Sequence, residues 1–205
     1  MKLQIDRTED IAKCVYDGQL PYNTTVAVPV GTEAVYIKNG TVAALLREGA
    51  TVVNGAGALK AAFTKCKDSQ KIFSVNRSKP FTVLWGTGGI GYTGKNGETK
   101  VAGSNGFYRF TTDNAAALLR RFGYADTITA DDVKKQLNGA VTGAVKEEVL
   151  RAINGGGYNV GAQTSAIQEC VQRKLEKIFA DYGLFLDCIA IEEVTDVYGG
   201  GNGEE

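Results

Sequence analysis

A glycine-rich segment follows an apolar run near the middle of the chain. Residues 81–96 read FTVLWGTGGIGYTGKN, and Gly86, Gly88 and Gly91 satisfy the spacing G-x-G-x-x-G. In dinucleotide-binding folds this spacing follows a strand and opens a helix whose N-terminal N–H groups hold a pyrophosphate. The segment therefore raises the hypothesis of a nucleotide-binding enzyme that uses the glycine loop from Gly86 to Lys95.

A second, overlapping pattern matches most of the phosphate-loop motif. Gly89, Gly94 and Lys95 reproduce the spacing G-x-x-x-x-G-K, although Asn96 stands where the motif has Ser or Thr. Both nucleotide motifs need a helix directly after the glycines, and the following residues, YTGKNGETKVAGSNGF, are too rich in glycine to form one. The spacing alone therefore leaves the nucleotide site as an alternative interpretation.

The Asn-Gly pairs of this region give a different prediction. Asn-Gly is a preferred dipeptide of tight hairpin turns, because both residues accept a positive φ. We expect Asn96-Gly97 and Asn105-Gly106 to be such turns, which would fold short strands such as Glu98 to Ala102 back on themselves. The local role of the stretch from Gly88 to Gly106 stays open at this level.

The remaining side chains offer little catalytic chemistry. The chain contains no histidine, so Ser-His-Asp and Cys-His systems cannot be built from it alone. Neighbouring carboxylates on a helix or strand do not face one another, so Glu147 with Glu148 and Glu192 with Glu193 are interpreted as solvated faces. Four widely separated cysteines without a C-x-x-C pair predict free core thiols; they are Cys14, Cys66, Cys170 and Cys188. We predict no catalytic, cofactor-binding or metal-binding residue.

Composition narrows the class of protein. The chain has 205 residues, 43% of them hydrophobic and 22% charged, which is typical of a single globular domain with its own core. The 23 basic residues balance 23 acidic ones, so no nucleic-acid partner is expected. No run reaches the roughly 18 apolar residues of a membrane-spanning helix, and the N-terminal MKLQIDRTED lacks the apolar core of a signal peptide. We expect a cytoplasmic protein.

Hydrophobic patterning predicts strands in the first half of the chain. Residues rich in β-branched and aromatic types form five candidate strands, at 24–30, 33–38, 41–46, 71–76 and 81–85, and a sixth at 107–111. Asn39-Gly40 is expected to form a hairpin turn between the second and third of them. Pro80 can stand before a strand but not in the middle of a central one.

The second half changes to helical periodicity. Asp113 is expected to cap a short helix that ends at Gly123. Thr129 and Asp132 resemble a capping box that opens a second helix, in which apolar residues recur every four positions: Val133, Leu137, Val141, Val145 and Val149. A third helix shows one apolar stripe and stops at Gly183; the stripe comprises Ile167, Val171, Leu175, Ile178, Phe179 and Tyr182.

Three segments in the same order resemble the SPFH superfamily, also called Band 7, to which stomatin, prohibitin and flotillin belong. VAVPVGTEAVYIKNGTV is similar to the opening hairpin of that domain. FSVNRSKPFTVLWGT is similar to a segment of the bacterial virion-core-protein-like (YdjI-like) branch, and KLEKIFADYGLFLDCIAIEEV resembles the end of the domain, where a helix reaches Y-G-L and turns into a final strand. The resemblance spans roughly Leu20 to Val194.

The resemblance implies an α+β fold, with a β-rich N-terminal half that forms a curved antiparallel or mixed sheet and a helical C-terminal half packed on it. We expect a single SPFH domain over 1–198 and a flexible tail over 199–205; the domain comprises a β-rich part at about 20–112, a helical part at about 113–183 and a last strand at about 184–194.

The resemblance also implies a function. Family members act without enzymatic activity of their own, as scaffolds that self-assemble into rings or cages at a membrane. We therefore expect a homo-oligomeric scaffold that associates peripherally with a membrane surface, at its inner face, or with a membrane-bound partner, and that takes no cofactor and no small-molecule substrate. Two alternatives stay open, namely the nucleotide-binding enzyme and a monomeric module that binds one protein partner.

Overall fold

The computed structural model of the protein describes residues 1–20, 24–52, 70–94, 96–155 and 164–197, with the backbone alone for 52 and 195–197. The chain divides into two compact units. The first contains Met1–Phe81, Thr111–Val133 and Ala180–Phe185, and the second contains Thr82–Phe110, Lys134–Phe179 and Leu186–Glu205. The expectation of one domain over 1–198 stays a prediction, and the tail at 199–205 lies outside the described residues.

The first unit is built on a five-stranded sheet in the order β11-β2-β7-β4-β5. Its strands are β2 (Ala12–Asp17), β4 (Thr32–Lys38), β5 (Thr41–Leu46), β7 (Gln70–Asn76) and β11 (Thr127–Ile128). All of its pairings are antiparallel. The central strands β4 and β7 alternate poorly between buried and exposed residues, because most of their side chains are buried on both faces.

A small second sheet in this unit has the order β1-β3-β6. Its strands are β1 (Lys2–Gln4), β3 (Thr25–Val28) and β6 (Gly49–Val52). The pair β1 and β3 is parallel, whereas β3 and β6 are antiparallel. The two sheets share one apolar core, to which the small sheet contributes Val26 and Val28 and the large sheet Ala34, Tyr36 and Ile72.

The predicted hairpin between residues 33 and 46 is confirmed. β4 and β5 pair antiparallel, and the turn residues Asn39 and Gly40 have φ values of 51° and 72°. A turn with two positive φ values matches the twist of the strands it joins, which is why Asn-Gly is selected here. Strands β1 and β2 precede residue 20, near which the β-rich part was expected to begin.

Helix α2 (Ala115–Arg121) also belongs to the first unit. The predicted cap Asp113 is wrong by one residue, because the side chain of Asn114 accepts the hydrogen bond from the backbone N–H of Ala117 at 3.0 Å. Gly123 follows the helix with a φ of 61°, as predicted for a left-handed stop.

The second unit contains a sheet in the order β12-β10-β8, with β9 paired to β10 as well. Its strands are β8 (Phe81–Gly86), β9 (Ile90–Thr93), β10 (Thr99–Thr112) and β12 (Leu184–Val197). The predicted turn at Asn96-Gly97 joins β9 to β10, with Gly97 at a φ of 84°. The predicted turn at Asn105-Gly106 is wrong, because both residues lie inside the 14-residue strand β10.

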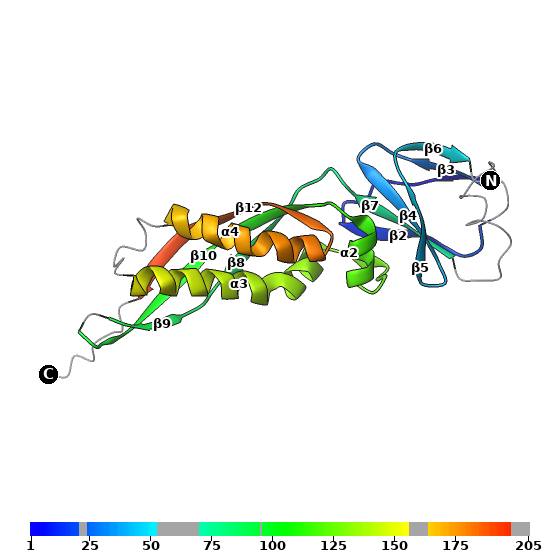
Figure 1. Ribbon diagram of the computed structural model, residues 1–205. Coiled ribbons are helices and arrows are strands. Elements are labelled where there is room, and N and C mark those ends of the chain that lie inside the picture. Colours follow the sequence, from blue (N-terminus) through cyan, green and yellow to red (C-terminus); the bar gives the residue numbers. More distant parts are fainter. Residues whose placement is uncertain (21–23, 53–69, 95, 156–163, 198–205) are drawn as a thin grey trace. The chain divides into compact units, whose positions relative to one another are not determined.

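Two long helices, α3 (Ala130–Asn154) and α4 (Thr164–Asp181), run along one face of this sheet (Figure 1). The capping box at the start of α3 is confirmed, since Thr129 N–H donates to Asp132 Oδ2 at 3.0 Å and Asp132 N–H donates to Thr129 Oγ1 at 3.2 Å. Phe179 of α4 packs edge-on against Tyr108 of β10, with ring centroids 5.4 Å apart. The predicted apolar stripe of α3 is fully buried, and that of α4 is buried at Ile167, Val171, Leu175 and Phe179.

The fold class is therefore α+β, with a β-rich N-terminal half, open sheets, three helices in the described part of the chain and a C-terminal strand. None of these helices is both long and apolar enough to cross a membrane.

Candidate functional site

The glycine-rich segment forms an irregularity within a long β-ribbon. Thr87 N–H donates to the carbonyl oxygen of Ser104 at 2.8 Å, and Ile90 of β9 stands opposite Ala102 of β10. Three steps along the chain lead from Thr87 to Ile90, but only two lead from Ala102 to Ser104. One extra residue on the glycine-rich strand defines a β-bulge, so β8 and β9 together form one bulged strand beside β10.

Gly88 and Thr87 account for the geometry of this bulge. Gly88 has a φ of 62°, in the left-handed region that bulges commonly fill with glycine. The hydroxyl oxygen of Thr87 accepts the backbone N–H of Ser104 at 3.0 Å, and the same hydroxyl lies 3.2 Å from the carbonyl oxygen of Ser104. The Thr87 side chain therefore restores hydrogen bonding where the ladder between the strands is interrupted.

The nucleotide motifs do not have the context that their chemistry needs. The chain after the glycines continues into strand β9, not into a helix. Gly91, the third glycine of the fingerprint, has no atom within 4 Å of the position a Cβ would take, so no close approach requires glycine there. Lys95 lies outside the described residues.

A shallow cavity of about 290 Å³ opens beside the bulge. Its lining contains Glu193 and no lysine or arginine; the other lining residues are Gly86, Gly88, Gly89, Val101, Ala102, Gly103, Ser104 and Asn105. Phosphate groups are held by cationic side chains or by the N–H groups of a helix N-terminus. The described lining provides neither of these.

Strand β8 presents an exposed edge and is a candidate functional surface. Among the described strands it has a neighbour on the β10 side alone, which makes it an edge of the sheet. Phe81, Val83 and Trp85 are buried, whereas Leu84 between them is 65% exposed. The sequence from 81 to 94 contains no charged residue. An apolar, uncharged edge strand is a template for pairing with another strand. We call residues 81–86 the β8 edge.

The opposite edge of the same sheet, strand β12, is protected against such pairing. Glu192 and Glu193 are exposed on it, as the sequence predicts. The side-chain oxygen Oε1 of Gln168, from helix α4, accepts the backbone N–H of Ile191 at 3.4 Å. Negative charge and a covered backbone group both disfavour addition of a further strand. The two edges of the sheet are therefore chemically different.

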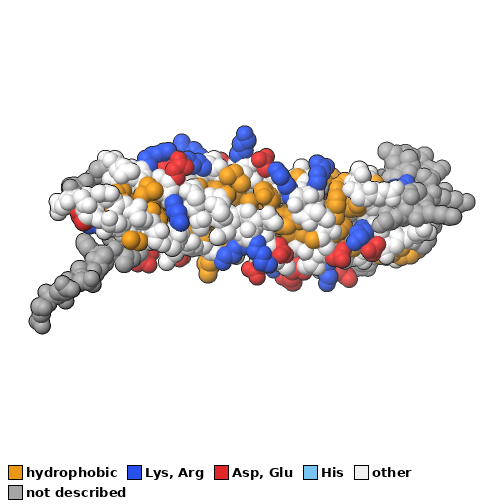
Figure 2. Space-filling view, turned by 90° about the horizontal axis from the view of Figure 1, so that it is seen from below, with side chains coloured by type: hydrophobic (Ala, Val, Ile, Leu, Met, Phe, Trp, Pro, Cys, Tyr) orange, Lys and Arg blue, Asp and Glu red, His pale blue; other side chains and the backbone are white. Residues whose placement is uncertain are grey.

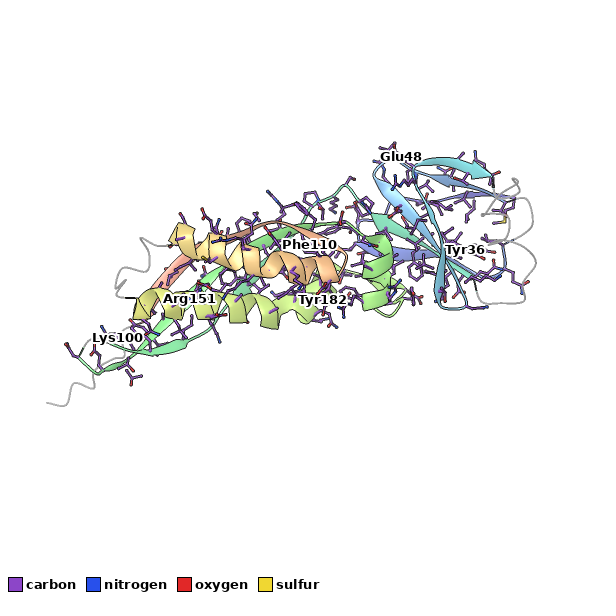
Figure 3. All side chains as sticks on the ribbon, in the orientation of Figure 1. Tyr36, Glu48, Lys100, Phe110, Arg151 and Tyr182 are labelled. Carbon is purple, nitrogen blue, oxygen red and sulfur yellow. The ribbon has the colours of Figure 1, made fainter. Side chains whose placement is uncertain are left out.

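Helices α3 and α4 are joined by a cluster of four charged side chains, of which Figure 3 labels Arg151 on α3. The prediction that Glu148 is solvated is wrong, because its side chain is only 4% exposed. Its Oε1 atom lies 2.6 Å from Lys174 Nζ and 3.0 Å from Arg151 Nη1. Lys174 also contacts Glu147 Oε1 at 2.8 Å. A buried carboxylate needs paired cations, so Arg151 and Lys174 stabilise the folded position of Glu148.

The Glu147–Lys174 contact should make the stability of the folded protein depend on pH. The hydrogen bond from Lys174 lowers the pKa of Glu147 below its ordinary value of 4.5. The stabilisation is therefore fully present above pH 4.5 and is lost as the pH falls through the lowered pKa of the folded state. We expect E147Q to unfold at a lower urea concentration than the wild type at pH 7, and the two proteins to converge in strong acid.

Urea titrations of both proteins across this pH range measure the effect. E176Q, on the same helix pair, removes an exposed carboxylate that has no ion pair among the described residues, and serves as the matched control. A difference between wild type and E147Q that persists unchanged in strong acid would exclude the ion pair as its cause.

The other predicted residues form no site in the described part of the chain. Cys14, Cys170 and Cys188 are free and half-buried, and Cys66 lies outside the described residues. The described residues contain no group of three or more Cys, Asp or Glu side chains that could hold a metal ion. On the face shown in Figure 2, basic and acidic side chains lie interspersed.

Sequence reasoning did not single out the β8 edge as a surface. Its signal was the absence of any charged residue from Phe81 to Gly94, directly after the charged run RSK.

Comparison of the chain with models of known protein families finds no match, and comparison with curated proteins finds none either.

Proposed function

We propose that this protein is a non-enzymatic scaffold that self-assembles and associates peripherally with a membrane or a membrane-bound partner. The observation that supports self-assembly is the β8 edge, where Leu84 is 65% exposed on an uncharged strand that has a neighbour on one side alone among the described strands. Soluble proteins usually protect such edges with charge, proline or a covering element, as β12 is protected here. Residues 82–86 themselves contain no charge and no proline, which supports a pairing role for this edge.

The resemblance to the SPFH superfamily supports the membrane-associated part of the proposal. Two of the segments that resemble this superfamily contain residues with a defined structural role. Thr87 of FTVLWGT holds the β-bulge, and Gly183 of Y-G-L ends helix α4 with a φ of 72°. The assembly into rings or cages at a membrane is what the resemblance implies for this chain.

Two measurements on the purified protein test the proposal. Light scattering across a wide range of concentration should give a mass above that of the 21.8 kDa monomer, and electron micrographs should show closed assemblies. Co-sedimentation with liposomes, with or without anionic lipid, tests the membrane association. A strict monomer at every concentration that also stays in the supernatant would overturn the proposal.

A further inference from the structure

We propose that two copies of this chain pair through their β8 edges, antiparallel and about a twofold axis, so that Leu84 of one copy lies opposite Leu84 of the other. The inference rests on the proposed self-assembly and names its contact surface, its symmetry and its register. Three observations support it: the direction of the backbone groups of β8, the residues that limit the edge available for pairing, and the distribution of charge on β8 and β12.

The backbone groups of the β8 edge alternate in direction. Thr87 N–H donates to the Ser104 carbonyl oxygen on β10, so every second residue counted back from Thr87 points its N–H and C=O groups toward β10. Thr82, Leu84 and Gly86 lie between those positions and point theirs away from β10. The same three residues are exposed, whereas the side chains between them are buried. The free hydrogen-bonding groups and the exposed side chains therefore belong to the same residues.

The ends of the free edge select one register. Pro80 precedes β8 and has no N–H to donate, and the bulge at Gly88 turns the strand after Gly86. Pairing is thus confined to Thr82, Leu84 and Gly86, whose centre is Leu84. The register with the greatest overlap places Leu84 against Leu84, about 5.5 Å apart between Cα atoms as in other hydrogen-bonded pairs, and Thr82 against Gly86.

Charge favours a second copy of the same edge as the partner. The β8 edge carries no charge, so two copies meet without repulsion, and the two Leu84 side chains cover each other's apolar surface. The β12 edge cannot pair with itself in this way, because Glu192 and Glu193 of both copies would approach one another. The commonest symmetry of protein dimers is the twofold axis that this pairing produces.

Opposite charges at position 84 test the register directly. In a twofold interface the two copies of position 84 meet, so L84K and L84D each place like charges opposite one another. We expect each variant alone to raise the dissociation constant of self-association by at least tenfold, which corresponds to about 1.4 kcal/mol. An equimolar mixture of L84K and L84D should associate again, with both variants in the same assembly.

The matched control is V30K, which changes another exposed apolar side chain, 68% exposed and outside the described strands. It should associate as the wild type does, and circular dichroism should show that all three variants fold. Sedimentation velocity with one variant carrying a fluorophore measures the association of the mixture.

The outcomes separate this inference from the proposed function. Association of the wild type, loss in each single variant and recovery in the mixture support the pairing. A wild type that associates while L84K also associates normally, or a mixture that stays monomeric, overturns the Leu84 register and leaves the scaffold proposal standing. A wild type that is monomeric throughout overturns both.

Discussion

Replacing Gly183 by alanine should destabilise the protein by about 2 to 5 kcal/mol. Gly183 has a φ of 72°, where a residue with a Cβ costs roughly 1 to 2 kcal/mol. An added Cβ would also meet the backbone carbonyl oxygen of Asn114 and lie 2.7 Å from the backbone nitrogen of Leu118. Overpacking against backbone adds about 1 to 3 kcal/mol, because neither atom can move without moving helix α2.

The surroundings of Gly183 fix it in place. The N–H groups of Asp113 and Asn114 both donate to its carbonyl oxygen at 2.9 Å, so the turn after α4 is docked on the start of α2. Gly123 is the matched control, because it has a φ of 61° and nothing within 4 Å of an added Cβ. Urea unfolding should show that G123A loses the backbone cost alone, about 1 to 2 kcal/mol. Equal losses in G123A and G183A would contradict the close approach to α2.

Replacing Gly106 by alanine should cost about 3 kcal/mol or more. A Cβ at this position would meet the carbonyl oxygen of Ala190 and lie 3.0 Å from both the carbonyl carbon of Ala190 and Cζ2 of Trp85. Ala190 belongs to β12 and Trp85 to β8, so the central strand β10 has no free direction in which to relieve the contact. We expect a lower midpoint of thermal unfolding and altered tryptophan fluorescence, since Trp85 is the only tryptophan.

Gly91 provides the control for this prediction. It lies in β9 of the same sheet and has no atom within 4 Å of an added Cβ, so G91A should be neutral or stabilise by about 0.5 to 1 kcal/mol. Strong destabilisation by G91A with little effect of G106A would contradict the structural account of these glycines.

The sequence predicts a feature of this fold well where the residues of one helix or one hairpin determine it. The stripe from Val133 to Val149 specifies a helix with one buried face, and Thr129 with Asp132 specifies where that helix begins. Asn39-Gly40 specifies a turn because the adjacent strands pair with each other. In each case the residues that act on one another are close in the sequence.

Features that depend on contacts between distant segments could not be predicted from local sequence patterns. Asn105-Gly106 carries the sequence signal of a turn, yet Gly106 is selected by the approach of Ala190, more than eighty residues later. The glycines after Trp85 match a nucleotide fingerprint in spacing, but one of them makes a β-bulge whose partner strand begins only at Thr99. The division of the strands among three sheets likewise follows from long-range pairing, such as that of β1 with β3.

The β8 edge could be read from the sequence only in part. The alternation of Phe81, Val83 and Trp85 with smaller or exposed residues predicts a strand with one buried face. That this strand lies at an edge depends on the order β12-β10-β8, which no local pattern contains. Only this order shows that the uncharged strand β8 and the acidic strand β12 are the two edges of one sheet.

Amide hydrogen exchange measured as a function of protein concentration tests the pairing of β8 edges residue by residue. The N–H groups of Thr82, Leu84 and Gly86 point away from β10, so they should exchange quickly in dilute protein and become protected as the concentration rises. The N–H groups of Val83 and Trp85, which already face β10, should change little. Exchange at all three outward-facing amides that is independent of concentration, in a sample that light scattering shows to be assembled, would contradict the pairing of β8 edges.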